Sequence, residues 1–152
     1  CHHNVGAILP CHVGDAVAVR LYGSRAACGF PSPADDYVES ALDLNELCIS
    51  NTVSTFFVRA EGDSMQGVGI EDGDLLVVDR SLDAVSGDVV VACVDGDLTV
   101  KRYVVSRGQA FLSPASDAYP VIALHEGREW SIWGVVTFTI KRHRGRHVRA
   151  ER

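Results

Sequence analysis

The sequence predicts a mainly β domain, and three observations lead to this prediction. β-branched and aromatic residues dominate several short runs after residue 51, which is the composition of strands. Gly/Asp pairs separate these runs at near-regular intervals, as turns do between antiparallel strands. The chain has 152 residues, 47% of them hydrophobic and 22% charged, which suffices for one domain with a buried core. No apolar run approaches the about 18 residues that a membrane helix needs, so we expect a soluble, unexported protein.

The N-terminal third is expected to be less regular. Residues 1 to about 34 contain several Gly and Pro residues without a sustained period, which predicts an arm with one short strand at Asp15–Tyr22. Between Asp35 and Cys48 apolar residues recur at helix-like intervals. This spacing predicts one or two short amphipathic helical turns, with Asp35 or Asp36 as the N-cap.

Five runs after residue 51 are expected to form strands, so with the strand in the arm the sequence predicts about six short antiparallel strands. Asp95-Gly96 lies between two apolar runs, and this dipeptide favours a tight β-hairpin turn. The five runs are Thr55–Ala60, Asp74–Asp79, Asp88–Val94, Leu98–Val105 and Trp130–Ile140.

The five cysteines are odd in number and widely spaced, which argues against a disulfide framework and favours free thiols in a reducing, cytoplasmic compartment. Cys48 and Cys93 are expected to be buried, because each lies in an apolar run. The N-terminal Cys and His residues lack a Cys-x-x-Cys pair and a second ligand cluster, so no metal site is predicted there. The cysteines are Cys1, Cys11, Cys28, Cys48 and Cys93, and the neighbouring histidines are His2, His3 and His12.

Charge is unevenly distributed along the chain. Residues 141–152 carry six basic side chains and one acidic one (+5), whereas the other 140 residues carry eight basic and nineteen acidic ones (−11). An acidic body is not typical of a dedicated DNA-binding domain. The basic tail is expected to be a solvated end, with contact to phosphates or to an acidic partner as the alternative.

Lys101 is the first candidate for chemistry. Strand alternation places it on one face with Thr99 and Tyr103, and either face could be the solvated one, so an ordinary surface lysine remains open. If the side chain is buried, desolvation lowers its pKa and makes it a usable general base.

Ser64 is the second candidate, because it follows a predicted strand in a turn that contains Gly62, Gly67 and Gly69. Such a turn can expose a hydroxyl and aim backbone amides at a developing oxyanion, although a plain turn residue remains the alternative. The body contains one histidine, His125, which lies in a polar loop and is expected at the surface. A serine without a suitable histidine can still act as a nucleophile if a neutral lysine takes its proton.

Several motifs together resemble the LexA/UmuD family of self-cleaving serine peptidases. The arm segment Ala27–Glu39, with the sequence ACGFPSPADDYVE, is similar to the cleavage region of UmuD proteins. The spacings also match that family, with 36 residues from Cys28 to Ser64 and 37 from Ser64 to Lys101. The matching body motifs are Gly62-Asp-Ser-Met65, Asp72-Gly-Asp74-Leu-Leu-Val-Val-Asp79, Gly87-Asp88 and Thr99-Val-Lys101.

The resemblance implies that Ser64 is the nucleophile and Lys101 the general base in cleavage of the chain's own Cys28–Gly29 bond. The backbone amides of Asp63 and Ser64 are then the expected oxyanion donors, and no cofactor is implied. The implied organisation is an arm over residues 1–28 that cleavage removes, a peptidase domain over 29–140 and a basic tail over 141–152.

The resemblance further implies a homodimer in the DNA-damage (SOS) response, with cleavage stimulated by the RecA–single-stranded DNA filament. The trimmed form would be the accessory subunit of an error-prone, UmuC-like Y-family translesion polymerase. Three other functions remain as alternatives: a non-cleaving polymerase-binding module, a fragment of a LexA-type repressor, and a signal peptidase-like enzyme. Residues 1–26 match no pattern of the family, and a start at Cys1 instead of Met is typical of a truncated or misassigned beginning.

Overall fold

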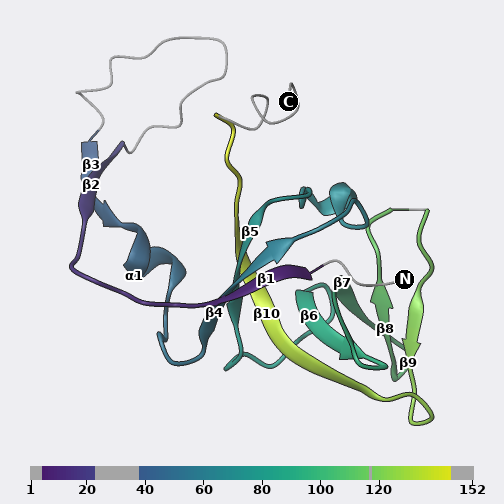
Figure 1. Ribbon diagram of the computed structural model, residues 1–152. Coiled ribbons are helices and arrows are strands. Elements are labelled where there is room, and N and C mark those ends of the chain that lie inside the picture. Colours follow the sequence, from purple (N-terminus) through teal and green to yellow (C-terminus); the bar gives the residue numbers. More distant parts are fainter. Residues whose placement is uncertain (1–4, 23–37, 117, 145–152) are drawn as a thin grey trace. The chain divides into compact units, whose positions relative to one another are not determined.

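The computed structural model describes residues 5–22, 38–116 and 118–144 (Figure 1). The chain divides into two compact units. One unit contains residues 1–11 and 53–152, and the other contains residues 12–52. In the described ranges, no helix is long and apolar enough to cross a membrane.

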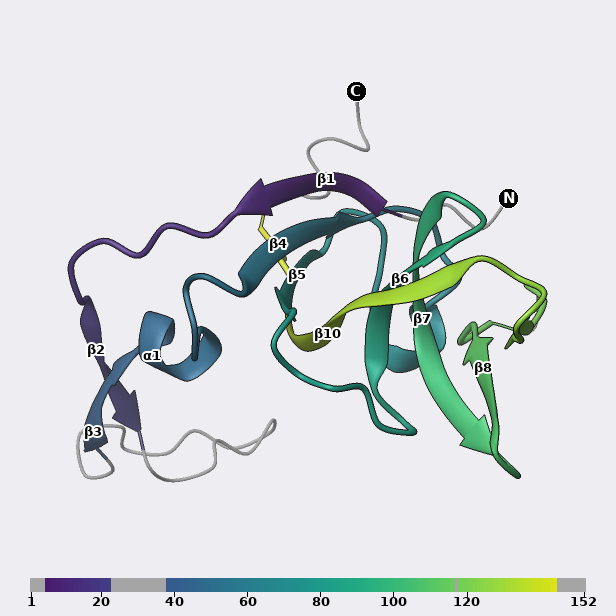
Figure 2. The same ribbon diagram turned by 90° about the horizontal axis from the view of Figure 1, so that it is seen from below.

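The larger unit is built on one antiparallel sheet of eight strands, in the order β1-β4-β5-β10-β6-β7-β8-β9 (Figures 1 and 2). The long strand β10 lies between β5 and β6 and so joins the two halves of the sheet. The strands are β1 Val5–Pro10, β4 Thr55–Ala60, β5 Leu75–Asp79, β6 Val89–Val94, β7 Asp97–Ser106, β8 Gln109–Ser113, β9 Ile122–Leu124 and β10 Trp130–Ile140.

The predicted mainly β fold is confirmed. β4 and β10 have the predicted bounds, and β5, β6 and β7 agree with the prediction to within one residue at each end. Asp95 and Gly96 form the β6–β7 turn with φ angles of 51° and 86°, because a two-residue turn of this kind needs positive φ at both positions.

Three strands of the sheet were not predicted. β1 contains Gly6 and ends at Pro10, a composition that indicates an arm, but it pairs with β4 at the edge of the sheet, where a Pro is tolerated. β8 and β9 have five and three residues, too few for a clear alternation of apolar and polar positions.

Two hydrophobic clusters bury the middle of the sheet. On β6, Val91 belongs to the first cluster, while its neighbours Val90 and Ala92 belong to the second. The faces of a strand alternate from residue to residue, so both faces of β6 are covered. Its partner β7 accordingly has three consecutive buried residues, Thr99, Val100 and Lys101.

The smaller unit contains the hairpin of β2 (Ala18–Tyr22) and β3 (Val38–Asp43), followed by the short helix α1 (Leu44–Cys48). The predicted strand in the arm and a helical segment are therefore present. The predicted one or two helical turns within 35–48 are met by α1 at Leu44–Cys48, whereas Val38–Asp43, which has the same helix-like spacing, forms a strand that pairs with β2. Cross-strand pairing satisfies backbone groups along the segment, which a single helical turn does poorly.

The helix cap also differs from the prediction. Asp43 is the N-cap of α1, and its Oδ1 accepts a hydrogen bond from the Asn45 amide at 3.0 Å. The predicted caps, Asp35 and Asp36, lie outside the described residues.

The cysteines within the described ranges, Cys11, Cys48 and Cys93, are free thiols. Cys48 and Cys93 are half-buried, so they are less buried than the sequence predicted. Cys93 faces away from the apolar cluster that its neighbours Ala92 and Val94 join, because strand alternation turns it to the other side. No group of three or more His, Cys, Asp or Glu side chains that could hold a metal ion occurs among the described residues.

Candidate active site

Ser64 lies in the loop that joins β4 to β5, residues 61–74. Its side chain is buried (4% exposed), and the next residue, Met65, is part of the first hydrophobic cluster. Met65 is followed by a single 3₁₀ turn, η2 (Gln66–Val68), which ends at Gly69 with a φ of 83°. Burial of Met65 and the tight turn after it fix the backbone on the C-terminal side of Ser64.

The segment after β8 holds the same turn from the other side. The Ala115 amide donates a hydrogen bond to the Ser64 carbonyl oxygen at 2.8 Å, and the Gly67 amide donates to the Ala115 carbonyl oxygen at 2.9 Å. A Cβ at position 67 would lie 2.4 Å from that carbonyl oxygen, so only glycine permits this approach. The turn at Ser64 is therefore held in place by a backbone-to-backbone contact.

Lys101 extends from β7 toward Ser64. Its Nζ lies 3.1 Å from Ser64 Oγ and 3.2 Å from the Val100 carbonyl oxygen, and it donates hydrogen bonds to both. The side chain is 1% exposed. Its cross-strand partner is Val90 of the second hydrophobic cluster. Strand alternation in the sequence left open whether the face that carries Lys101 is solvated or buried, and in the structure Lys101 is buried.

Burial lowers the pKa of Lys101 to about 8 from an ordinary value of 10.5. The cause is desolvation of the ammonium group, since in the described part of the chain no carboxylate lies within ion-pair distance of Nζ. A lysine with this pKa is partly neutral near neutral pH. It can therefore accept a proton from the adjacent hydroxyl.

Thr99 is a polar residue that the sequence did not single out as part of the site. It lies two residues before Lys101 on the same face of β7 and is fully buried (0% exposed). Its hydroxyl has no hydrogen-bond partner within the described ranges. The alternation of β7 already placed Thr99 beside Lys101, and this was the signal that could have identified it.

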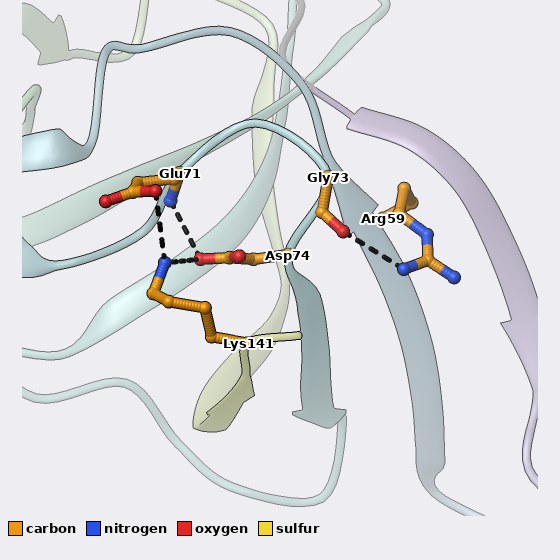
Figure 3. Close-up of polar contacts among 5 residues, drawn as sticks. All are labelled: Arg59, Glu71, Gly73, Asp74 and Lys141. Carbon is orange, nitrogen blue, oxygen red and sulfur yellow. Dashed lines mark hydrogen bonds and ion pairs between the residues drawn. The ribbon is translucent and has the colours of Figure 1, made fainter. Parts of the chain in front are cut away.

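A second lysine contacts the far end of the same loop (Figure 3). Lys141, the residue after β10, places Nζ 2.6 Å from Asp74 Oδ2 and 3.6 Å from Glu71 Oε2. The Asp74 side chain is completely buried, and the same Oδ2 accepts a hydrogen bond from the Glu71 amide at 2.9 Å. Arg59 of β4 donates to the Gly73 carbonyl oxygen at 3.0 Å. These contacts anchor the loop where it enters β5.

The structure describes some of the other predicted residues, namely Asp63 and His125. Asp63 is exposed and precedes Ser64 in the turn, and the role of the two backbone amides as oxyanion donors stays a prediction. The Cys28–Gly29 bond lies outside the described residues, as does the tail after Arg144. His125 is exposed, as predicted, and its Nδ1 accepts a hydrogen bond from the Gly127 amide.

Comparison with known proteins assigns the family. The family described as Peptidase S24-like matches residues 20–137. Protein ImpA of Salmonella typhimurium is 47% identical over 137 residues, which cover 90% of this chain and 92% of that protein. Protein MucA of Escherichia coli is 42% identical over 127 residues, covering 83% of this chain and 86% of MucA. LexA repressor 1 of Nocardia farcinica is 38% identical over 141 residues, covering 92% of this chain and 62% of the repressor. The chain therefore belongs to the S24-like serine peptidase family, as a UmuD-like member of its LexA/UmuD group.

Proposed function

We propose that this protein cleaves its own chain at the Cys28–Gly29 bond, with Ser64 as the nucleophile and Lys101 as the general base. The observation that supports this most directly is the 3.1 Å approach of Lys101 Nζ to Ser64 Oγ. Both side chains are buried, and no competing carboxylate lies within ion-pair distance of Lys101 among the described residues. An uncompensated lysine beside a buried hydroxyl is costly for a fold that needs only stability, and it is the arrangement that a Ser/Lys peptidase requires.

In the proposed mechanism, neutral Lys101 takes the proton from Ser64 Oγ as the oxygen attacks the carbonyl carbon of Cys28. The backbone amides of Asp63 and Ser64 stabilise the negative charge on the carbonyl oxygen in the tetrahedral intermediate. The intermediate collapses by breaking the C–N bond, and the ammonium of Lys101 returns the proton to the departing amine of Gly29. Lys101 then activates a water molecule that hydrolyses the Ser64 ester, which leaves a new carboxylate on Cys28.

The bond to be cut suits this site chemically. Gly29 has no Cβ, so the backbone at the bond can approach a nucleophile closely. The substrate is part of the same chain, and tethering of this kind supplies a high effective concentration without an elaborate binding pocket. The limiting step is then the placement of the arm beside Ser64, and a partner that favours that arrangement accelerates the reaction.

The proposed biological role follows from the family and from the arm sequence. The UmuD-like cleavage segment at Ala27–Glu39 supports a role in the SOS response, with the RecA–single-stranded DNA filament as the accelerating partner. The trimmed protein would then act as a homodimer and as the accessory subunit of an error-prone, UmuC-like translesion polymerase. The similarity to ImpA and MucA over more than four-fifths of the chain supports the same placement.

Mass spectrometry of the purified chain tests the proposal. Incubation at alkaline pH should slowly yield a fragment that begins at Gly29, and RecA filament should accelerate its appearance at neutral pH. The variants Ser64→Ala and Lys101→Ala should remain intact, whereas Ser131→Ala, which alters an exposed serine of β10, should be cleaved like the wild type. Cleavage of Ser64→Ala at the normal rate would show that the nucleophile is wrong. A wild-type chain that stays intact under all conditions would support a non-cleaving polymerase-binding module instead.

A further inference from the structure

The segment between β8 and β9 contacts the Ser64 turn through a side-chain pair as well as through its backbone. The hydroxyl of Tyr119 donates a hydrogen bond to Asp63 Oδ1 at 2.6 Å, across 56 residues of sequence. Asp63 directly precedes Ser64. The short distance is typical of a hydroxyl that donates to a carboxylate, and the pair lies at the protein surface.

This pair lies beside the two backbone bonds that join Ala115 to the turn. The Ser64 carbonyl oxygen accepts from the Ala115 amide, and the Ala115 carbonyl oxygen accepts from the Gly67 amide. Tyr119 therefore provides a third attachment, four residues further along the same segment. The close approach at Gly67 leaves no room between the two segments, so movement of one is transmitted to the other.

The third attachment persists under the conditions in which the proposed base is active. Asp63 raises the pKa of Tyr119 above its ordinary value of 10, through the hydrogen bond and through its charge. Lys101 loses its proton around pH 8. The tyrosine hydroxyl therefore remains a donor across the pH range in which Lys101 becomes neutral.

We propose that Tyr119 and the side chain of Asp63 are a positioning pair that regulates cleavage by fixing the Ser64 turn against the segment after β8. While the pair is bonded, Ser64 Oγ stays within reach of Lys101 and the adjacent amides keep their orientation. When the pair opens, the turn loses its side-chain bond to the segment after β8 and keeps the two backbone bonds to Ala115, so the nucleophile is less well placed. This inference rests on the proposed peptidase function, and it assigns the pair no contact with the reacting atoms.

The cleavage test compares the wild type with Tyr119→Phe, which removes only the hydroxyl. Asp63→Asn keeps an acceptor oxygen but loses the charge. Ser116→Ala is the matched control, because it removes a hydrogen bond to the Ala118 amide that lies wholly within the segment after β8. Rates are measured from pH 6 to pH 10, and the melting temperature of each variant is recorded.

Tyr119→Phe should lower the alkaline plateau of the cleavage rate about tenfold, since small misplacements of reacting groups have effects of this size. The midpoint of the pH profile should not move, because Lys101 is untouched. Asp63→Asn should lower the plateau by less than tenfold. The double variant Tyr119→Phe/Asp63→Asn should have the same plateau as Tyr119→Phe alone, and Ser116→Ala should have the plateau of the wild type. A Tyr119→Phe plateau within twofold of the wild type, or a shift of the midpoint without a lower plateau, would overturn the inference.

Hydrogen exchange supplies a measurement that does not depend on cleavage. In Tyr119→Phe the amides of Gly67 and Ala115 should exchange about tenfold faster than in the wild type, because the bonds that protect them open more often. Unchanged exchange would overturn the positioning role. If the wild type is never cleaved, the proposed peptidase function fails, and the exchange rates alone then decide whether the pair holds the turn.

Discussion

Two lysines contact the two ends of one loop, and their surroundings differ in charge and in exposure. Lys101 reaches Ser64 near the beginning of the loop, is 1% exposed and bonds only to a hydroxyl and a carbonyl oxygen within the described residues. Lys141 reaches Asp74 at the end of the loop, and its side chain is 26% exposed and lies within 4 Å of two carboxylates. The same side-chain type is desolvated without a counter-charge in one place and paired in the other.

The difference shows how one fold obtains reactivity and stability from the same residue type. A buried cation with no anionic partner destabilises the fold and loses its proton easily, which makes it useful as a base. An ammonium group beside a buried carboxylate satisfies that carboxylate and anchors the chain. In the loop of residues 61–74, the end at Ser64 therefore provides reactivity (the chemical end), and the end at Asp74 provides stability (the structural end).

Replacement of each lysine by methionine should separate the two roles most clearly. Lys101→Met removes the base while keeping a long apolar side chain, and cleavage should fall by at least about 10³-fold. Lys141→Met should leave the cleavage rate within about twofold but lower the free energy of unfolding by about 2 kcal/mol, because the buried Asp74 loses its ammonium partner. Fragment analysis and urea unfolding measure the two effects. Equal loss of cleavage in both variants would show that the two ends of the loop do not act separately.

The pH dependence of cleavage should follow Lys101. With a pKa of about 8, the neutral fraction and hence the rate should rise about fiftyfold between pH 6 and pH 8, then level off above pH 9. The rate is measured from the amount of fragment over time in buffers of equal ionic strength. A rate that is flat, or that falls, over this range would contradict a lysine base.

Lys101 should also make the free energy of unfolding depend on pH. The pKa of Lys101 is about 8 in the folded protein and 10.5 in the unfolded chain, so between these values the unfolded chain binds more protons. The free energy of unfolding should therefore increase as the pH rises from about 8 to 10.5, by about 3 kcal/mol from this group. The comparison of Ser64→Ala with the double variant Ser64→Ala/Lys101→Met isolates this contribution in proteins that are not cleaved. Identical pH profiles of the two would show that Lys101 is not desolvated.

The fold could be predicted from the sequence where local pattern and tertiary structure agree. The Thr55–Ala60 and Trp130–Ile140 strands are rich in β-branched and aromatic residues, and they form with the predicted bounds. Val38–Asp43 has apolar residues at helix-like intervals, yet it forms a strand because β2 is available as a partner. Pairing partners far away in sequence are not visible in a local pattern.

The site could be predicted only in part, for the same reason. The motifs around Ser64 and Lys101 pointed to both residues, but alternation left the burial of Lys101 undecided. That burial depends on the two hydrophobic clusters that cover both faces of the β6–β7 pair. The anchor at Asp74 was missed as well, since it needs Lys141, which lies 67 residues away at the end of β10.

Replacement of Asp74 by asparagine tests the structural end of the loop with a smaller change. Asparagine keeps the shape and an oxygen that can accept from the Glu71 amide, but it removes the charge that faces Lys141. The free energy of unfolding should fall by about 1 kcal/mol, with cleavage within about twofold of the wild type. Urea unfolding and fragment analysis are again the measurements. A large loss of cleavage at unchanged stability would mean that the anchor also positions Ser64.

The smallest expected effect concerns Thr99, whose buried hydroxyl lies on the same face of β7 as Lys101 and has no partner within the described ranges. Thr99→Val replaces this dipole with a methyl group and makes the surroundings of the lysine more apolar. Because an apolar environment disfavours the charged form, the pKa of Lys101 should decrease further, and the midpoint of the rate profile should shift down by about 0.3 pH units. Measurement of the rate from pH 6 to pH 9 resolves such a shift, with Thr137→Val on β10 as a control for loss of a threonine hydroxyl elsewhere in the sheet. A midpoint that moves up instead would show that the Thr99 hydroxyl favours the neutral amine, and that burial alone does not set the pKa of the base.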